Sequence, residues 1–151
     1  MKDKLVEKLY EFSKKPYQKY FKKNQPWPIS KTDLLMHNPK TLGYELGNFL
    51  EKNNFEIQSK LEDHDVIHVL TNTGTSVIEE IGMQFYLLGN GKKSMYLLLV
   101  IATGTCFYPT RIQYFINQYH RGKLSHQFHQ LDFSKMLHFE ILLIQNTFNI
   151  H

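Results

Sequence analysis

The chain has 151 residues, a formal net charge of +4, 42% hydrophobic and 14% aromatic residues, and one cysteine. This length permits a single domain with a sizeable core, and the lone cysteine excludes an intramolecular disulfide framework and fits a reducing compartment. The longest apolar run, residues 95–102, is well below the ~20 residues of a membrane span, so we expect no integral membrane protein.

Residues 1–36 form a basic and aromatic N-terminal segment. Nine of the eighteen Lys and Arg residues lie within the first 31 positions, and an amphipathic helix is predicted over residues 2–13. Acidic residues at positions 3 and 7 argue against a secretory or mitochondrial leader, so we expect a cytoplasmic location. The cations suit either a solvated helical face or contact with an anionic membrane surface, on the inner face of a bacterial membrane. Nucleic-acid binding is not expected, since the chain has no recognition motif.

Helix caps and apolar spacing predict the elements that follow. Ser30 and Asp33 are typical of an N-cap and a first-turn acid. Asn38 and Pro39 predict the start of a second helix, because proline favours the first helical turn, and an asparagine pair at 53–54 ends it. A third helix is predicted from about Asp63 to the Thr-Asn-Thr-Gly sequence at 71–74.

The second half of the chain continues in the same way. Ser76 is typical of the N-cap of a helix that ends at the Gly-Asn-Gly sequence 89–91. The run 95–102 is apolar on every side and predicts a central buried helix, although its length also suits a buried strand. Pro109 predicts the start of a helix with four inward side chains, namely Ile112, Phe115, Ile116 and Tyr119. A last helix is predicted over residues 133–147.

These elements predict an all-α fold. We expect one domain over residues 1–151, built as a compact bundle of about seven helices. The apolar segments 83–88, 95–102 and 112–119 could line an apolar groove, although an apolar stripe at helical spacing usually belongs to the core.

A His-Asp-Val-Ile-His sequence at 64–68, followed by Glu80, is the strongest chemical signal. Two histidines four residues apart on a helix project from the same face, and Glu80 can reach them from the next helix. Imidazole nitrogen and carboxylate oxygen are ligands of Zn²⁺, Mn²⁺ or Fe²⁺. The sequence therefore predicts an inter-helix site for a divalent metal ion, with zinc first and manganese or iron as alternatives. A solvent-facing or hydrogen-bonded histidine pair is the competing interpretation.

The spacing of these residues resembles the metal-binding signature of coenzyme Q biosynthesis protein four, the ubiquinone biosynthesis scaffold family. His64, Asp65, His68 and, after eleven further residues, Glu80 match that signature. Other segments are similar to the family in the same order: Thr41-Leu42-Gly43, His68-Val69-Leu70, Gly74-Thr75-Ser76 and Tyr119-His120-Arg121-Gly122-Lys123. The resemblance covers residues 39–148.

The resemblance implies an all-helical fold, a metal site, peripheral membrane attachment and binding of polyprenylated quinone precursors. It also implies removal of the ring C1 carboxylate from a prenylated hydroxybenzoate, in an oxidative decarboxylation. By position, the metal-site residues would be His64, Asp65, His68 and Glu80, whereas Glu79 does not have the required spacing. Other quinone biosynthesis proteins are the protein partners to be expected.

Three side chains have further candidate roles. Asp65 is either a metal ligand, a group that orients an imidazole, or the catalytic acid that moves a proton. Arg121 and Lys123 could hold a carboxylate or phosphate headgroup, or they could neutralise the end of a helix. The leading function is a metal-dependent lyase, and the alternative is a non-catalytic metal-containing scaffold that binds isoprenoid lipid. An unrelated metal hydrolase is less favoured.

Overall fold

The computed structural model describes residues 4, 8, 26–58 and 62–151. Within these residues the chain forms seven α-helices and two short 3₁₀ helices: α2 (Lys31–Leu35), α3 (Leu42–Lys52), α4 (Glu62–Thr71), α5 (Val77–Gly89), α6 (Met95–Phe107), η1 (Pro109–Arg111), α7 (Ile112–Leu124), η2 (Phe133–Lys135) and α8 (Ile141–Phe148). This part of the chain has no strand and contains one isolated bridge, between Thr41 and Glu140. The predicted all-α fold is confirmed.

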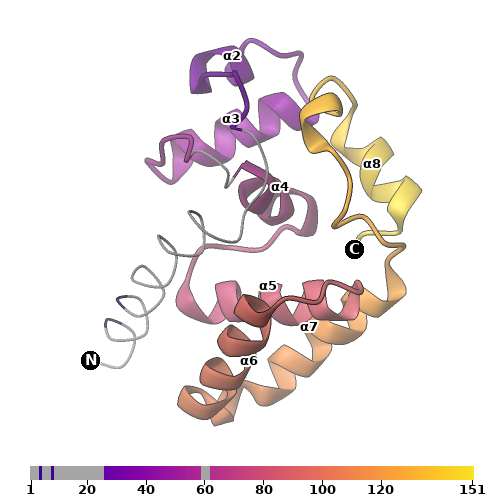
Figure 1. The fold of residues 1–151 in the computed structure, drawn as a ribbon. Helices are drawn as coiled ribbons and strands as arrows, with labels where there is room; N and C mark the ends of the chain where they lie inside the picture. The colour runs from indigo at the N-terminus through magenta and orange to yellow at the C-terminus, as the bar shows by residue number, and fades with distance from the viewer. Residues whose placement is uncertain (1–3, 5–7, 9–25, 59–61) are drawn as a thin grey trace.

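The helices form two groups that meet around α4 (Figure 1). Helices α2, α3 and α8 lie at one end of the molecule, α5, α6 and α7 lie at the other, and α4 lies between them. One main core joins the two groups, and its fully buried side chains include Leu34, Leu42, Val66, Tyr86 and Phe128. Burial of this shared apolar surface holds the two groups together.

The N-terminal segment is described only in part. The predicted helix over 2–13 lies outside the described residues except at Lys4 and Lys8, which are both helical and exposed. From residue 26 onwards the predicted start at Ser30 is confirmed. Ser30 Oγ accepts the Asp33 amide at 3.1 Å, and the Asp33 carboxylate accepts the Ser30 amide at 2.9 Å. This reciprocal capping box satisfies two amides that have no partner inside the helix.

Helix α3 begins later than the sequence predicts. Its N-cap is Thr41, whose Oγ1 accepts the amide of Tyr44 at 3.4 Å, whereas the predicted start lay at Asn38 and Pro39. Lys40 adopts a positive φ of 71°. A left-handed residue cannot belong to a right-handed helix, so the helix starts only after it.

The prediction of a single helix over residues 133–147 is wrong. The segment divides into η2 and α8, and the residues between them bind the first turn of α3. The Leu42 amide donates to the Phe139 carbonyl at 2.9 Å, and the Gly43 amide donates to the Leu137 carbonyl at 2.8 Å. The first amides of a helix have no partner within it, so these long-range hydrogen bonds outweigh the local helical pattern.

Helices α5 and α7 cross at a very short distance. A Cβ atom added at Gly122 would lie 1.9 Å from the Tyr86 carbonyl oxygen, and one added at Gly89 would lie 2.1 Å from that of Tyr119. Only glycine permits such an approach. Residues 81–87 of α5 are all buried, so most of the segment 83–88, predicted to line a core or a groove, lies in the core.

Helix α6 is helical, as predicted, but it is neither central nor buried. Its buried residues are Leu97 and Gly104, whereas Met95, Leu98 and Leu99 are 71%, 48% and 60% exposed. The expectation of burial was wrong because an all-apolar run indicates burial only when other elements cover every side. Here α5 packs against one side of α6, and the opposite side is open to solvent.

The predicted inward face of α7 is confirmed in part. Phe115 is fully buried and Tyr119 is half-buried, but Ile112 and Ile116 are each 38% exposed. Among the described residues, no single helix has the length and hydropathy needed to cross a membrane. Helix α6 and the segment Pro109–Leu124 have that length and hydropathy only when they are taken together, and the chain bends by 104° between them.

Candidate metal centre

Helix α4 places His64 and His68 one turn apart on the side that faces α5. Three acidic residues lie in its first turn, where carboxylates stabilise the positive end of the helix dipole. One of them, Glu62, is buried, and its Oε1 accepts the amide of Trp27 at 3.1 Å. The start of α4 is therefore tied both to its own charges and to the chain that precedes α2.

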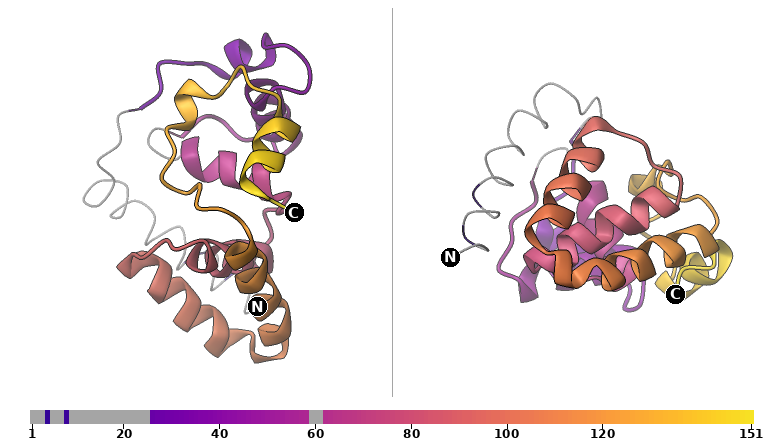
Figure 2. Two further views of the ribbon diagram at one scale, coloured as in Figure 1. Left: turned by 90° about the vertical axis from the view of Figure 1, so that its right-hand side faces the viewer. Right: turned by 90° about the horizontal axis from the view of Figure 1, so that it is seen from below.

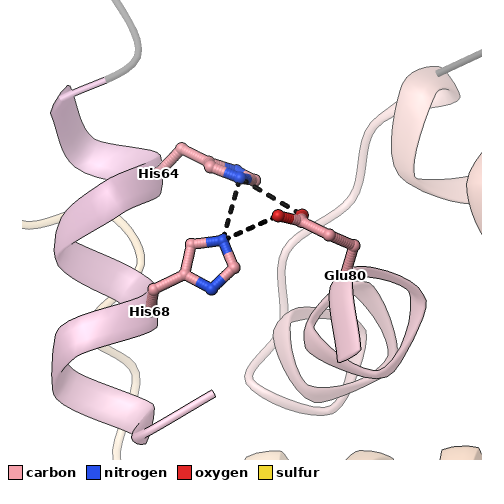
Figure 3. A group of neighbouring side chains, drawn as sticks. All are labelled: His64, His68 and Glu80. Carbon is pink, nitrogen blue, oxygen red and sulfur yellow. Dashed lines mark hydrogen bonds and ion pairs between the residues drawn. The ribbon is translucent and has the colours of Figure 1, made fainter. Parts of the chain in front are cut away.

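Glu80 comes from the first turn of α5, opposite the two histidines (Figure 3). Ser76 caps this helix, and its N–H and Oγ donate to Glu79 Oε2 at 3.2 and 2.6 Å. The Glu79 amide donates to Ser76 Oγ at 3.4 Å and completes the capping box. The cap holds the carboxylate of Glu79 at the start of the helix, and the carboxylate of the next residue, Glu80, faces α4.

The ligand atoms of three side chains converge between α4 and α5. The Nε2 atoms of His64 and His68 are 3.1 Å apart. The Glu80 carboxylate spans them, with Oε2 at 3.3 Å from His64 Nε2 and Oε1 at 3.0 Å from His68 Nε2. The His68 side chain is 1% exposed, while those of His64 and Glu80 are 18% and 16% exposed. Solvent therefore reaches the group at His64 and Glu80 but not at His68.

His68 is held from two further sides. Its Nδ1 lies 3.1 Å from the carbonyl oxygen of Thr73, and the Thr73 amide donates back to the His68 carbonyl at 3.0 Å. A carbonyl oxygen only accepts, so Nδ1 carries a proton, and in the neutral ring Nε2 presents its lone pair to the other two side chains. The ring of Phe49 stacks on the imidazole with a centroid distance of 5.5 Å. These contacts fix both the orientation and the tautomer of His68.

Phe49 and Thr73 were not predicted as site residues. Phe49 belongs to the apolar face of α3 and Thr73 to the turn after α4, and their spacing from the histidines indicates no contact. The available signal is Asn72, a residue type that tolerates left-handed angles and here has a φ of 51°. The tight turn that it allows brings the Thr73 carbonyl back to His68.

Burial and charge oppose one another at this group. Burial alone would lower the pKa of His68, but the hydrogen bond and the negative charge of Glu80 outweigh burial and raise that pKa above its ordinary value. Burial would likewise raise the pKa of Glu80, but the charges and hydrogen bonds of His64 and His68 hold that pKa well below its ordinary range. Without a metal ion, the contact is therefore an ionised carboxylate paired with a His68 ring that readily takes up a proton.

The same three side chains fit a divalent metal ion. Two ligand atoms that each lie about 2.1 Å from a tetrahedral zinc ion are about 3.4 Å apart. Here the two Nε2 atoms are 3.1 Å apart, and each lies 3.3 or 3.0 Å from the nearer oxygen of the Glu80 carboxylate. Among the described residues, His64, His68 and Glu80 form the one group of His, Cys, Asp and Glu side chains that could hold a metal ion. Three protein ligands would leave a coordination position open, as in catalytic zinc sites.

Asp65, which the sequence analysis proposed as a ligand or a proton donor, lies outside this triad. It is half-buried on α4 and is not one of the converging residues. Burial and Glu80 have the larger effects on the pKa of His68, and the charge of Asp65 adds a smaller contribution that raises it. Its position suits a group that acts on the ligands rather than one that holds the ion.

Arg121 and Lys123, the predicted headgroup cations, differ in their surroundings. Arg121 donates to Gln118 Oε1 at 2.8 Å and to the Thr71 carbonyl, at the end of α4, at 3.3 Å. Its Nε also donates to the carbonyl of His151 at 2.8 Å. Arg121 therefore joins α7, the end of α4 and the last residues of the chain. Lys123 is exposed in the last turn of α7.

Comparison with known proteins finds a similar fold. No protein-family model matches the chain, and no curated protein matches its sequence. Among solved structures, the crystal structure of a provisionally named ubiquinone biosynthesis protein from Nostoc punctiforme is similar, with a TM-score of 0.70 and 16% sequence identity. The match covers 100% of this chain and 82% of that one. At this identity the likeness shows a shared fold, which agrees with the all-helical fold that the sequence resemblance implies.

Proposed function

We propose that this protein is a metal-dependent enzyme of quinone biosynthesis, which removes the C1 carboxylate from a prenylated hydroxybenzoate as carbon dioxide in an oxidative decarboxylation. In this reaction a hydroxyl group takes the place of the carboxylate, and an external oxidant, dioxygen, accepts the two electrons that are released. The observation that carries the proposal is the convergence of His64, His68 and Glu80, whose ligand atoms lie within 4.8 Å of one another. The pathway is supported by the signature that residues 64–80 resemble and by the name of the structural neighbour. Zinc is the proposed metal, and manganese and iron are the alternatives.

Separate residues are proposed for metal binding, proton transfer and headgroup contact. A bound metal ion supplies a Lewis acid, which stabilises the negative charge that a departing carboxylate leaves behind. His64, His68 and Glu80 are the groups that hold the ion. Asp65, half-buried one turn or less from both histidines, is the proposed group that moves a proton. Exposed Lys123 is the proposed contact for an anionic headgroup, whereas Arg121 would first have to release its internal hydrogen bonds.

The alternative function is a non-catalytic scaffold that binds isoprenoid lipid and other quinone biosynthesis proteins. It is favoured by the place of the triad, which links α4 to α5 where the two helix groups meet (Figure 1). A metal ion there would fix the relative position of the groups without any chemistry. For either function, the proposed location is the cytoplasm, with peripheral attachment to the inner face of the bacterial membrane.

Metal analysis of the purified chain tests the proposal. Wild type and Glu79→Ala are expected to hold metal in equal stoichiometry, because Glu79 serves the cap of α5. His64→Ala and Glu80→Ala are expected to lose it. Glu79→Ala is the matched control, since it removes the neighbouring carboxylate from the same turn. Retention of metal by both triad variants would contradict the proposal.

Incubation with a prenylated hydroxybenzoate separates the two functions. Release of carbon dioxide by the metal-loaded wild type, and its loss in His64→Ala, supports the decarboxylase. Asp65→Asn is expected to keep the metal and to lose most of the activity, because it retains shape but cannot deliver a proton. If the metal-loaded wild type binds prenyl lipid but releases no carbon dioxide, the result supports the scaffold function.

A further inference from the structure

The outer side of α6 is a continuous apolar surface. Its exposed positions recur with helical spacing: Met95, Leu98, Leu99, Ala102, Thr103 and Cys106. Residues three, four and seven apart share one face of a helix, so these six side chains form one stripe, the α6 stripe. None of the six is charged, and the large side chains at 95, 98 and 99 are 71%, 48% and 60% exposed.

The opposite side of α6 is anchored. Leu97 is fully buried in the main core. A Cβ atom added at Gly104 would lie 2.6 Å from the side chain of Ile81 on α5. These contacts prevent α6 from rotating to hide the stripe. A contiguous exposed apolar patch marks a site of interaction, so the stripe, which no described residue covers, is a candidate surface for a partner.

The charges around the stripe indicate what this partner is. Residues 81–131 contain five Lys and Arg residues and no Asp or Glu. Lys92 and Lys93 lie just before Ser94, the N-cap of α6, and Arg111 follows the helix in η1. An apolar stripe with cations at both ends complements the apolar interior and the anionic headgroups of a phospholipid leaflet.

Two other classes of partner fit these charges less well. Nucleic acid would require cations along the stripe itself, where they would neutralise phosphates. A second copy of the chain, docked through the same stripe, would bring two basic regions together, and like charges disfavour such contact. The combination of an uncharged centre with basic ends therefore favours a membrane.

The shape of this end of the molecule agrees with contact along a surface. Figure 2 shows α6 and α7 meeting in a V that forms the end of the second helix group. Helix α6 has 13 residues, which rise about 20 Å, whereas the hydrocarbon core of a bilayer is about 30 Å thick. A helix of this length, bent away from its successor by 104°, suits a position in the plane of the interface.

We propose that the α6 stripe docks the protein on an anionic phospholipid membrane. Met95, Leu98 and Leu99 enter the boundary of the acyl chains, and Lys93 and Arg111 contact phosphate headgroups. The metal triad lies on a different face of α5 from α6, because Glu80 contacts His64 and His68 of α4 whereas Ile81 packs against Gly104 of α6. The proposal therefore does not depend on bound metal or on decarboxylation, and it assigns membrane contact to a surface other than the basic N-terminal segment.

Cys106 allows a direct test in the full-length protein. It is the only cysteine of the chain and is exposed within the stripe, so one environment-sensitive dye can be attached there. Vesicles of phosphatidylcholine with phosphatidylglycerol should shift the dye emission to the blue, and phosphatidylcholine alone should do so far less. The control is the Cys106→Ser chain with Leu142→Cys on α8, since Leu142 is 60% exposed and belongs to the other helix group. Its dye should not respond.

A matched pair of substitutions tests the side chains themselves. Leu99→Glu and Leu142→Glu alter leucines that are each 60% exposed. Leu99→Glu should bind phosphatidylglycerol vesicles about ten-fold more weakly, because the membrane no longer buries that leucine side chain. Leu142→Glu should bind like wild type. Circular dichroism melting checks the fold, and Met95→Glu replaces Leu99→Glu if that variant is unfolded. Lys93→Gln with Arg111→Gln should remove the preference for anionic over neutral vesicles.

Three results would overturn the proposal. The first is equal vesicle binding by Leu99→Glu and Leu142→Glu. The second is a wild-type dimer that Leu99→Glu converts to monomers in sedimentation velocity without any change in vesicle binding, because the stripe would then be a self-association surface. The third is a dye at Cys106 that responds to double-stranded DNA and not to vesicles. Docking through the α6 stripe builds on the membrane attachment given in the proposed function, but none of these results bears on metal content or on carbon dioxide release. The proposed metal site and its chemistry would therefore stand or fall separately.

Discussion

Two regions of the molecule depart in opposite ways from the rule that polar side chains are exposed and apolar ones buried. One is the contact between α4 and α5, and the other is the outer side of α6. At the contact, His68 is 1% exposed and the Glu80 side chain 16% exposed, although both can carry charge. On α6, Leu99 is 60% exposed although it is apolar. Buried polar groups and exposed apolar patches are the arrangements that call for an explanation.

The two regions differ in whether other residues of the described chain offset the unfavourable burial or exposure. Within the described residues, every buried side-chain nitrogen or oxygen atom has a hydrogen-bond partner, and His68 has Glu80 on one side and Thr73 on the other. The α6 stripe has no such compensation, because hydration of apolar surface is unfavourable wherever it is exposed. The polar contact is thus satisfied within the chain, whereas no described residue covers the stripe.

The largest effect should come from metal at the polar contact. Added zinc is expected to raise the free energy of unfolding by about 4 kcal/mol at a free concentration about 1,000 times its Kd, because it binds only the folded triad. Urea unfolding with and without a chelator measures this difference. Glu79→Ala should gain as much as wild type, and His64→Ala should gain nothing. An equal gain in His64→Ala would place the metal elsewhere.

Removal of the carboxylate should have the next largest effect. In the presence of a chelator, Glu80→Ala is expected to lose about 1–3 kcal/mol of stability, because buried His68 and partly exposed His64 lose the carboxylate that both rings contact. The rings can remain neutral and contact one another, which limits the loss. Urea unfolding of the metal-free protein measures it. A loss within about 0.5 kcal/mol, the range of an ordinary surface substitution, would show that the contact contributes little.

The pH should act on the same contact with a smaller effect, since it removes charge but keeps every atom. The pKa of His68 is raised above 6.5, so its pairing with Glu80 is complete below pH 6.5 and is lost as the pH rises through the raised value. The pKa of Glu80 is lowered from 4.5, so its contribution is complete above pH 4.5 and is lost as the pH falls towards the lowered value.

Metal-free protein should therefore draw most stability from this contact between pH 4.5 and 6.5. With bound metal, the free energy of unfolding should instead rise with pH above 6.5. The ligands must lose their protons before they bind the ion, so stabilisation by metal increases with pH. Denaturation midpoints over this range, with and without metal, test both limbs. His68→Gln should flatten the metal-free decline at alkaline pH; an unchanged decline would assign it to another group.

The polar contact was open to sequence analysis because local rules determine it. Two histidines four residues apart must share a face of α4. Ser76 is the N-cap of α5, and Glu79 completes its capping box, whereas Glu80 was selected by the spacing of the signature that residues 64–80 resemble. The helix period, the ligand chemistry and that resemblance thus indicate the same three residues before any tertiary contact is known.

The remaining features depend on contacts between distant segments. The carbonyls of Leu137 and Phe139 leave the helical pattern because the first turn of α3 needs acceptors, and nothing near residue 139 indicates this. Phe49 reaches His68 only through the packing of α3 on α4. An apolar run such as 95–102 likewise shows which side chains avoid water but does not show what covers them.

The smallest effect on stability should come from the α6 stripe. Leu99→Ser is expected to change the free energy of unfolding by no more than about 0.5 kcal/mol, because the side chain already contacts water in the folded chain. Urea unfolding at low and high protein concentration, without lipid, measures it. A loss above about 1.5 kcal/mol would mean that Leu99 is covered in solution, and dependence on concentration would identify the cover as a second copy. A negligible loss of stability, together with weaker vesicle binding by Leu99→Glu, would show that the stripe contributes to membrane binding and not to folding. At the polar contact, by contrast, the same side chains contribute to both stability and ligand binding.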